Sequence, residues 1–301
     1  MEVSSRTMDA PGATIVYDVR GPLPTADGRP PLLMIGQPMD AAGFATLASY
    51  FPDRTVITYD PRGLGRSTRS DGRTDNDPRQ HAEDLHLLVA GLGVGPVEVF
   101  GSSGGAIDGL ALAETYPEDM TVLVAHEPPL TRLLPDADAV RRAEQEIYRA
   151  YQEAGFGAGM ARFIAYTSWQ GELTDEFFDR PPPDPAAFGL PTDDDGSRDD
   201  PLLSGDSDAV VAWAPNVDTL AASGVRLVVA AGEESASEVT GRSAHVLAAR
   251  LGLPLTMFPS HYGGFLGPES GWPGQPEAFA VRLHEVLRTP GEAIGDPQGR
   301  T

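Results

Sequence analysis

Val97-Glu-Val-Phe-Gly-Ser-Ser-Gly-Gly105 is the stretch that decides the fold. Four residues typical of a buried strand lead into the pattern Gly-x-Ser-x-Gly, and residues 106–113 then form an apolar stretch typical of a buried helix. A strand that passes through this pentapeptide into a helix holds the central serine on a sharp, strained turn. The spacing of the two outer glycines puts Ser103, not Ser102, in that central position. Ser103 is therefore the predicted nucleophile.

Gly104 follows the serine and opens the predicted helix. A backbone N–H at a helix N-terminus points towards negative charge, and here it points to the place where an oxyanion forms when a serine attacks a carbonyl carbon. A chance Gly/Ser-rich turn would lack the strand and the helix on either side. The flanking residues therefore favour the catalytic interpretation of the motif.

Short apolar runs alternate with longer amphipathic stretches on both sides of this motif. Strands are predicted at 13–19, 31–35, 55–59, 97–100, 121–125, 225–231 and 255–258, and helices at 42–50, 78–92, 104–116, 235–251 and 276–287. This alternation predicts an α/β fold with a mostly parallel central sheet flanked by helices. The tail from Thr289 onward is expected to fray.

The alternation stops between residues 127 and 216. Amphipathic helices are predicted at 136–154 and 159–169, and a stretch rich in Pro and Asp follows at 181–208. We therefore predict a core domain formed by 1–128 and 217–301, with an inserted helical cap at 129–216. Aromatic residues of the cap are expected to form its core or to cover an apolar pocket: Tyr148, Tyr151, Phe163, Tyr166, Trp169, Phe177 and Phe178.

The composition excludes several classes of function. All 22 basic residues are arginine, so the chain has no lysine for Schiff-base chemistry, for anchoring pyridoxal phosphate or for a P-loop. It has no cysteine for disulfides, thiol catalysis or thiolate metal sites. A net charge of -22 repels nucleic acid and anionic lipid, so neither is an expected partner. With no signal-peptide core and no apolar run of about 18 residues, a cytoplasmic protein is expected.

A serine needs a general base to become nucleophilic at neutral pH. Four of the six histidines lie in predicted helices: His81, His86, His245 and His284. His126 ends a predicted strand. His261 follows the last strand and precedes Gly263-Gly264, so it lies on a loop at the carboxyl end of the sheet, where ligands bind in open α/β folds. His261 is the predicted base.

Three segments together resemble the α/β-hydrolase superfamily. They are Tyr59-Asp-Pro-Arg-Gly-Leu-Gly-Arg-Ser67, the turn at Gly101–Gly105, and Ser260-His-Tyr-Gly-Gly264. The resemblance extends over nearly the whole chain. It implies the α/β-hydrolase fold, a capped serine esterase-like activity and a catalytic triad in the order serine, acid, histidine. These motifs are specific for the fold and not for a substrate.

The chain departs from the family after the third strand, where members usually carry His-Gly. Here the residues are Ile35-Gly-Gln-Pro38. The oxyanion donor at this place is a backbone N–H, so the loss of the histidine side chain need not disable it. The resemblance assigns the oxyanion hole to Gln37 and Gly104, while a plain turn residue is the other interpretation of Gln37.

A second departure concerns the acid of the triad. The usual aspartate is replaced by Ser235 in Gly232-Glu-Glu-Ser235. Some members take the acid from the end of the sixth strand, where this chain has Glu127 followed by two prolines. Either loop can bring a carboxylate to the far side of His261, where it would fix the tautomer and stabilise the imidazolium. Glu127 is the preferred acid, Glu234 is the alternative, and a capping or salt-bridge role is the non-catalytic interpretation of Glu127.

These features predict two-step acyl transfer on a small-molecule substrate. We expect a carboxylic ester, lactone or thioester of a small to medium hydrophobic molecule. The mechanism needs neither a metal nor an organic cofactor. The oligomeric state is not indicated. Two alternatives stay open: a hydrolase-like protein that binds a ligand with slow or no turnover, and an acyltransferase or haloperoxidase-like member.

Overall fold

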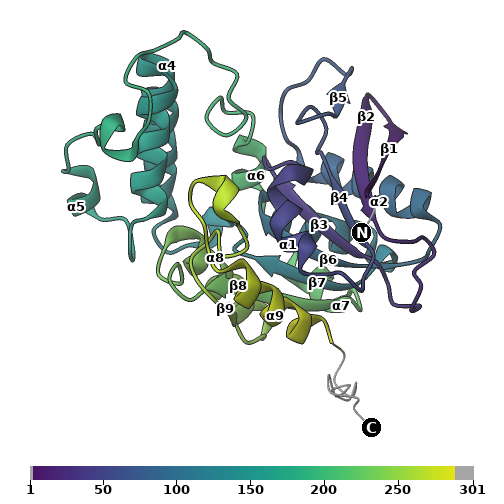
Figure 1. The fold of residues 1–301 in the computed structure, drawn as a ribbon. Coiled ribbons are helices and arrows are strands. Elements are labelled where there is room, and N and C mark those ends of the chain that lie inside the picture. The colour runs from purple at the N-terminus through teal and green to yellow at the C-terminus, as the bar shows by residue number, and fades with distance from the viewer. Residues whose placement is uncertain (1–2, 289–301) are drawn as a thin grey trace.

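The computed structural model describes residues 3–288, so the expectation for the tail lies outside it (Figure 1). Within these residues nine strands form one sheet in the order β1-β2-β4-β3-β6-β7-β8-β9, with β5 paired to β2. The strands are β1 (Val3–Ala10), β2 (Ala13–Arg20), β3 (Leu32–Gln37), β4 (Val56–Tyr59), β5 (Thr68–Arg69), β6 (Val97–Ser103), β7 (Met120–His126), β8 (Arg226–Gly232) and β9 (Thr256–Phe258).

All neighbouring strands from β4 to β9 are parallel, whereas β1 and β2 are antiparallel to their neighbours. The sequence interpretation missed β1. Most of its residues are exposed, so they do not show the apolar alternation by which a half-buried strand is recognised. The pairing of β1 with β2 along its whole length makes this polar segment a strand.

Helices cover both faces of the parallel part. They are α1 (Ala45–Ser49), α2 (Pro78–Leu92), α3 (Gly104–Thr115), α8 (Val239–Leu251) and α9 (Pro276–Leu287). Short 3-10 helices lie at Ala41–Phe44, Pro117–Asp119, Thr131–Leu133, Pro185–Phe188 and Pro268–Ser270. The predicted bounds of α2 and α9 are those of the structure, while the helix predicted at 42–50 is a 3-10 turn followed by α1.

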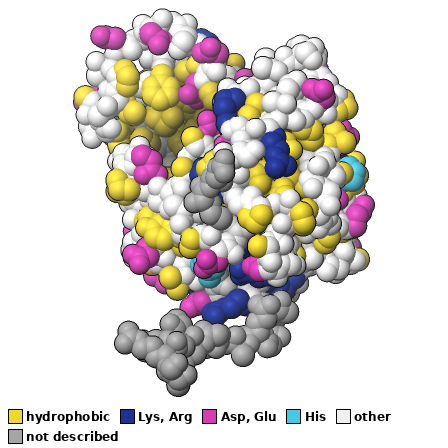
Figure 2. Space-filling view, turned by 45° about the vertical axis from the view of Figure 1, so that its right-hand side comes forward, with side chains coloured by type: hydrophobic (Ala, Val, Ile, Leu, Met, Phe, Trp, Pro, Cys, Tyr) yellow, Lys and Arg dark blue, Asp and Glu magenta, His cyan; other side chains and the backbone are white. Residues whose placement is uncertain are grey.

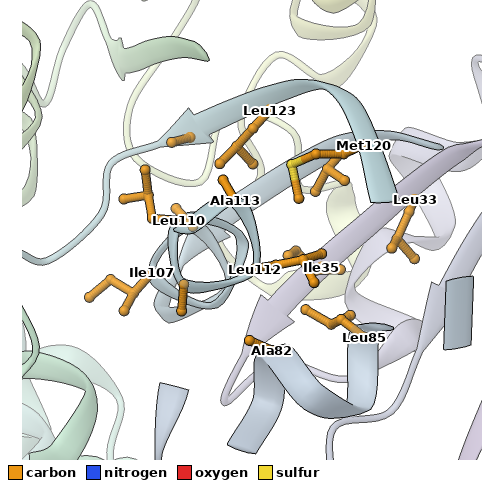
Figure 3. Packing of buried hydrophobic residues seen from close by; sticks show 14 of the residues in the cluster. Leu33, Ile35, Ala82, Leu85, Ile107, Leu110, Leu112, Ala113, Met120 and Leu123 are labelled. Atoms are coloured by element: carbon orange, nitrogen blue, oxygen red, sulfur yellow. The ribbon is translucent and has the colours of Figure 1, made fainter. Parts of the chain in front are cut away.

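Consecutive residues of β3 enter two different cores. Leu33 and Ile35 pack with α2, α3 and α8 on one face of the sheet (Figure 3). Leu32 and Met34 pack with α1 and α9 on the other face. Because both faces are covered, the strand is a continuous apolar run and not an alternating one. The central strands are thereby fixed in place, and their carboxyl ends can hold a site.

The segment between β7 and β8 is helical. It contains α4 (Ala137–Thr167), α5 (Asp175–Phe178), α6 (Asp208–Ala212) and α7 (Val217–Ala222), and α4 and α5 stand away from the sheet in Figure 1. The two predicted helices are joined as α4, which is broken at Gly155 (φ 81°). Arg162 pairs with Glu146 across that break, so the halves fold back on each other. We keep 129–216 as the proposed extent of the cap.

Residues 3–288 contain neither a membrane-spanning helix nor a cluster of potential metal ligands. No helix there combines the length and the apolar character needed to cross a membrane. Nor do three or more His, Asp or Glu side chains in that part of the chain gather as they would around a metal ion.

Candidate active site

Ser103 lies where β6 passes into α3, in a backbone conformation that few residues other than glycine adopt. Its φ is 57° and its ψ is -127°. The glycines around it are required by close contacts: a Cβ built on Gly101 would lie 2.7 Å from the carbonyl oxygen of Gly105, and one on Gly105 would overlap the carbonyl of Ile35. The turn therefore holds Ser103 at the carboxyl edge of the sheet, as the sequence motif predicts.

Gln37 lies directly beside Ser103. The parallel register of β3 and β6 pairs these two residues. A Cβ on Gly104 would lie 2.5 Å from the carbonyl oxygen of Gln37, so the end of β3 touches the start of α3. Gln37 is buried, and its side-chain Nε2 has no hydrogen-bond partner among the described residues. The structure thus brings together the two residues assigned to the oxyanion hole, Gln37 and Gly104. Within the described part of the chain, the side-chain amide nitrogen of Gln37 is unpaired at this place.

Glu127 is fully buried at the end of β7, also with a positive φ, of 48°. Its carboxylate accepts hydrogen bonds from the N–H of Gly232 (2.8 Å) and the hydroxyl of Ser235 (2.5 Å), and a third from the hydroxyl of Thr240. Burial raises the pKa of this carboxyl above its ordinary value, and the three donors oppose the shift. Ser235 stands where the family usually has its aspartate, and the structure fills that place with the carboxylate of Glu127.

Glu234, the alternative acid, is exposed. Its backbone N–H donates to the carbonyl oxygen of Ser260 (3.1 Å). By contrast, Glu127 shares a neighbour with the histidine loop, because a Cβ on Gly232 would lie 2.9 Å from the carbonyl carbon of His261. The burial of Glu127 and its three hydrogen-bond donors favour it over Glu234 as the acid of the proposed triad.

His261 is turned away from the other candidates. Its Nδ1 accepts the N–H of Gly263 (3.0 Å), and its Nε2 lies 3.3 Å from the carbonyl oxygen of Pro273. The ring stacks on Trp272 with 3.8 Å between centroids and 17° between planes. Among the described residues it makes no hydrogen bond to Ser103 or Glu127. Its role as base remains a prediction.

Tyr262 is the residue that the sequence interpretation missed. The side chain of Ser103 and the carboxylate of Glu127 both act on the pKa of its phenol, so the phenol lies near these two groups. Burial raises the pKa of the phenol above its ordinary value, the Ser103 hydroxyl lowers it, and the Glu127 carboxylate raises it. The available signal was position alone, because Tyr262 is the neighbour of the predicted base on the same loop.

His126 is a buried residue that contacts the strand end leading to Ser103. It is fully buried, and its Nδ1 lies 3.3 Å from the hydroxyl of Ser102, the residue before the predicted nucleophile. Burial lowers the pKa of the imidazole to about 3. The ring packs edge-on against Phe258 and Phe279. His126 is therefore a neutral core residue at neutral pH, and it is distinct from the reacting groups.

The cap contains a cavity of about 210 Å³ between the two halves of α4 and the segment around α5. Aromatic and apolar residues dominate its lining, which includes Ile147, Tyr166, Trp169, Phe177 and Phe178. Figure 2 shows hydrophobic side chains gathered in a hollow at the upper left, where the cap lies. Tyr148 is 46% exposed and so belongs to neither the cap core nor this lining.

Comparison with known proteins gives one family. Residues 30–165 match the family model described as the alpha/beta hydrolase fold. The Bacillus subtilis (strain 168) protein YraK, named as a hydrolase, is 38% identical over 146 residues, which are 48% of this chain and 52% of YraK. The chain thus spans about half the length of this curated relative.

Solved structures agree over nearly the whole chain. An esterase from Thermogutta terrifontis superposes with a TM-score of 0.61 at 20% identity, covering 96% of this chain and 98% of its own. The enol-lactonase from Burkholderia xenovorans LB400 superposes with a TM-score of 0.61 at 17% identity, covering 94% of this chain and 99% of its own. At such identities these structures show the fold, and they confirm the predicted fold class. Together with the match of residues 30–165 to the family model, they show that the chain has the α/β-hydrolase fold.

Proposed function

We propose that the chain is a serine hydrolase in which Ser103 attacks the carbonyl carbon of an ester, lactone or thioester of a small to medium hydrophobic molecule. The observation that carries the proposal is the strained backbone of Ser103 at the start of α3, beside the end of β3. This conformation is costly and persists only where the surrounding structure enforces it, as at nucleophile turns.

The proposed reaction has two steps. The Oγ of Ser103 bonds to the carbonyl carbon while its proton passes to a base, and the oxyanion accepts hydrogen bonds from the N–H groups of Gln37 and Gly104. The bond to the leaving group then breaks, and the proton goes to that group. Water repeats the sequence and releases the acid from Ser103. Each oxyanion donor contributes about 3 kcal/mol to the transition state.

Glu127 is the proposed acid of the site, since it is the buried carboxylate next to the histidine loop. The sequence pattern assigns the base to His261. In the described conformation this role would require the ring to leave both Pro273 and Trp272. The assignment of the base is therefore a separate question from the assignment of the nucleophile.

The substrate class is argued from chemistry and from the cap. A serine alkoxide suits carbonyl carbon, whereas displacement at sp³ carbon on this fold uses a carboxylate nucleophile. We propose that a hydrophobic acyl group extends from Ser103 towards the cap, whose cavity is lined largely by aromatic and apolar residues and by none of the reacting residues. Solved proteins of this fold named as an esterase and an enol-lactonase are consistent with that class.

A second candidate function is a ligand-binding protein with slow or no turnover. The observation that favours it is that His261 bonds to Gly263 and Pro273, while a phenol, that of Tyr262, lies near Ser103. Such a protein would keep the pocket and the nucleophile turn but would lack an efficient proton acceptor.

The test is the hydrolysis of p-nitrophenyl butyrate by wild type, Ser103→Ala and, as a control, Ser49→Ala at an exposed serine of α1. We expect turnover that Ser103→Ala abolishes and Ser49→Ala leaves unchanged. Turnover that survives Ser103→Ala would contradict the proposal. A folded wild type that binds hydrophobic esters without releasing p-nitrophenol would support the second candidate.

A further inference from the structure

His261 and its neighbour Tyr262 are both candidates for the position of the general base opposite Ser103. Ser260 has a φ of 74°, so the chain turns sharply as it enters the loop after β9. The loop backbone packs on Gly232, which donates to Glu127: a Cβ on Gly232 would lie 2.7 Å from the carbonyl oxygen of Ser260. The phenol of Tyr262 lies near Ser103 and Glu127, since both act on its pKa. A phenol therefore lies near both the proposed nucleophile and the buried acid, where a triad has its base.

The ring of His261 is held in its outward position from several sides. Both of its nitrogens have partners: Nδ1 accepts from the N–H of Gly263, so Nε2 carries the proton that faces the carbonyl of Pro273. Trp272 covers one face of the ring. A Cβ on Gly263 would lie 3.2 Å from Cε1 of His261 and 3.1 Å from the Trp272 ring, so the loop backbone packs against both.

We infer that Tyr262, and not His261, occupies the base position opposite Ser103, and that this arrangement makes the chain an intrinsically slow hydrolase. The inference rests on the proposed role of Ser103 as nucleophile. It deepens that proposal by assigning a residue to the base position, because the phenol of Tyr262 lies near the side chain of Ser103 while the ring of His261 faces Pro273.

The chemistry of a phenol explains why the reaction would be slow. A neutral phenol can exchange a hydrogen bond with Ser103, but its oxygen is a very weak proton acceptor. The phenolate would accept the proton, but with an ordinary pKa of about 10 it is scarce at neutral pH. Burial and the Glu127 charge make it scarcer still by raising the pKa of Tyr262. When Ser103 bonds to the carbonyl carbon, its proton must therefore leave to water.

An imidazole at position 262 would remove this limitation. It would accept the Ser103 proton as the new bond to carbon forms, and would return it to the leaving oxygen as the old bond breaks. Glu127, whose charge acts on position 262, is the buried carboxylate that would accept a hydrogen bond from the second imidazole nitrogen. General bases contribute about 100- to 10,000-fold to such reactions, so Tyr262→His should accelerate turnover.

The experiment measures kcat/KM for p-nitrophenyl butyrate in wild type, His261→Ala, Tyr262→His, Ser103→Ala and the double variant Ser103→Ala/Tyr262→His. We expect Tyr262→His to gain about a hundredfold or more. This gain should disappear when Ser103 is also replaced. His261→Ala should change the rate by less than about tenfold, since its ring contacts no reacting atom in the structure.

Two further measurements separate catalysis from structure. In the Tyr262→His background, Glu127→Gln should remove most of the gain, while the exposed Glu234→Gln should leave it. The rate of Tyr262→His should reach a plateau above a pKa near 6.5, the ordinary value for histidine, whereas the wild-type rate should keep rising into alkaline pH.

A folded Tyr262→His that is no faster than wild type would overturn the inference. So would a loss of more than about a hundredfold in His261→Ala, a variant that decides the matter even if Tyr262→His does not fold. Turnover that persists in Ser103→Ala would instead contradict the proposed nucleophile, so the two claims fail in different variants.

Discussion

The hydroxyl of Ser235 donates a hydrogen bond of 2.5 Å to the carboxylate of Glu127, and so joins the loop after β8 to the end of β7. The two residues are 108 positions apart in the sequence. A serine stands where α/β-hydrolases usually place their acid, and the proposed acid comes from the end of the neighbouring strand. The carboxylate therefore lies close to the usual place although it starts from a different residue.

This contact predicts that Glu127→Gln lowers stability. Three donors converge on the two oxygens of the carboxylate, and an amide would present one NH₂ group to at least one of them. We expect a loss of about 1–3 kcal/mol in the free energy of unfolding, measured by urea denaturation. Glu234→Gln is the matched control and should change it by less than about 0.5 kcal/mol, because Glu234 is exposed. Equal effects of the two variants would argue against the donor cluster.

Gly104→Ala should impair catalysis through geometry. The new methyl would lie 2.5 Å from the carbonyl oxygen of Gln37, so β3 and α3 must move apart at the proposed oxyanion hole. We expect kcat/KM to fall by about 100-fold, the cost of one misplaced oxyanion donor. Gly91→Ala in α2 is the control, since nothing lies within 4 Å of its added methyl. That variant should stabilise the helix by about 0.5–1 kcal/mol and leave activity intact.

His126 predicts a pH dependence of stability. The pKa of its imidazole is lowered to about 3 by burial, against an ordinary value near 6.5. Between these values the unfolded chain binds a proton that the folded chain does not, so stability is lost as the pH falls below about 6.5. The slope from this group is about 1.4 kcal/mol per pH unit at most.

The measurement is the free energy of unfolding between pH 7 and pH 4.5 for wild type and His126→Phe. In His126→Phe the free energy of unfolding should fall less steeply with decreasing pH, because one buried histidine is gone. His245→Gln, at an exposed position of α8, should keep the wild-type slope of unfolding free energy against pH. His81, also buried and with a pKa lowered to about 3, should maintain part of the slope in both variants. If His126→Phe leaves the slope of unfolding free energy against pH unchanged, the imidazole of His126 is not buried in its neutral form.

Gly155→Ala tests the fold of the cap. Gly155 has a φ of 81° and an added methyl would overlap the side chain of Asp194. Gly171 has a similar φ of 87° but open space around it, so Gly171→Ala isolates the backbone strain. We expect Gly155→Ala to be the more destabilising by about 1–3 kcal/mol, with faster hydrogen exchange in α4. Equal costs would mean that the break in α4 does not depend on that contact.

Much of the core could be predicted from the sequence because its signals are local. The apolar run of β3, the amphipathic period of α2 and the glycines around Ser103 each depend on neighbouring residues alone. β1 could not be recognised, since its exposed side chains leave no pattern and its strand form comes from pairing with β2. The two helices predicted at 136–154 and 159–169 are the two halves of α4, but the way they fold back at Gly155 depends on backbone angles that the sequence does not report.

Some features of the candidate site could likewise be predicted from the sequence, and others could not. The turn at Ser103 follows from its pentapeptide, and the choice of Glu127 follows from the serine at position 235. The orientation of the loop after β9 depends on contacts of Gly263, Trp272 and Pro273, which come together only in the folded chain. A histidine and a tyrosine in adjacent positions look equally able to reach Ser103, and only the fold distinguishes them.

The most direct test of the central claim is peptide mapping by mass spectrometry after prolonged incubation with a fluorophosphonate, which modifies activated serines. The account predicts one adduct, on the peptide that contains Ser103, and none in Ser103→Ala. An unmodified Ser103 in the folded wild type, or an adduct that persists in Ser103→Ala, would contradict it.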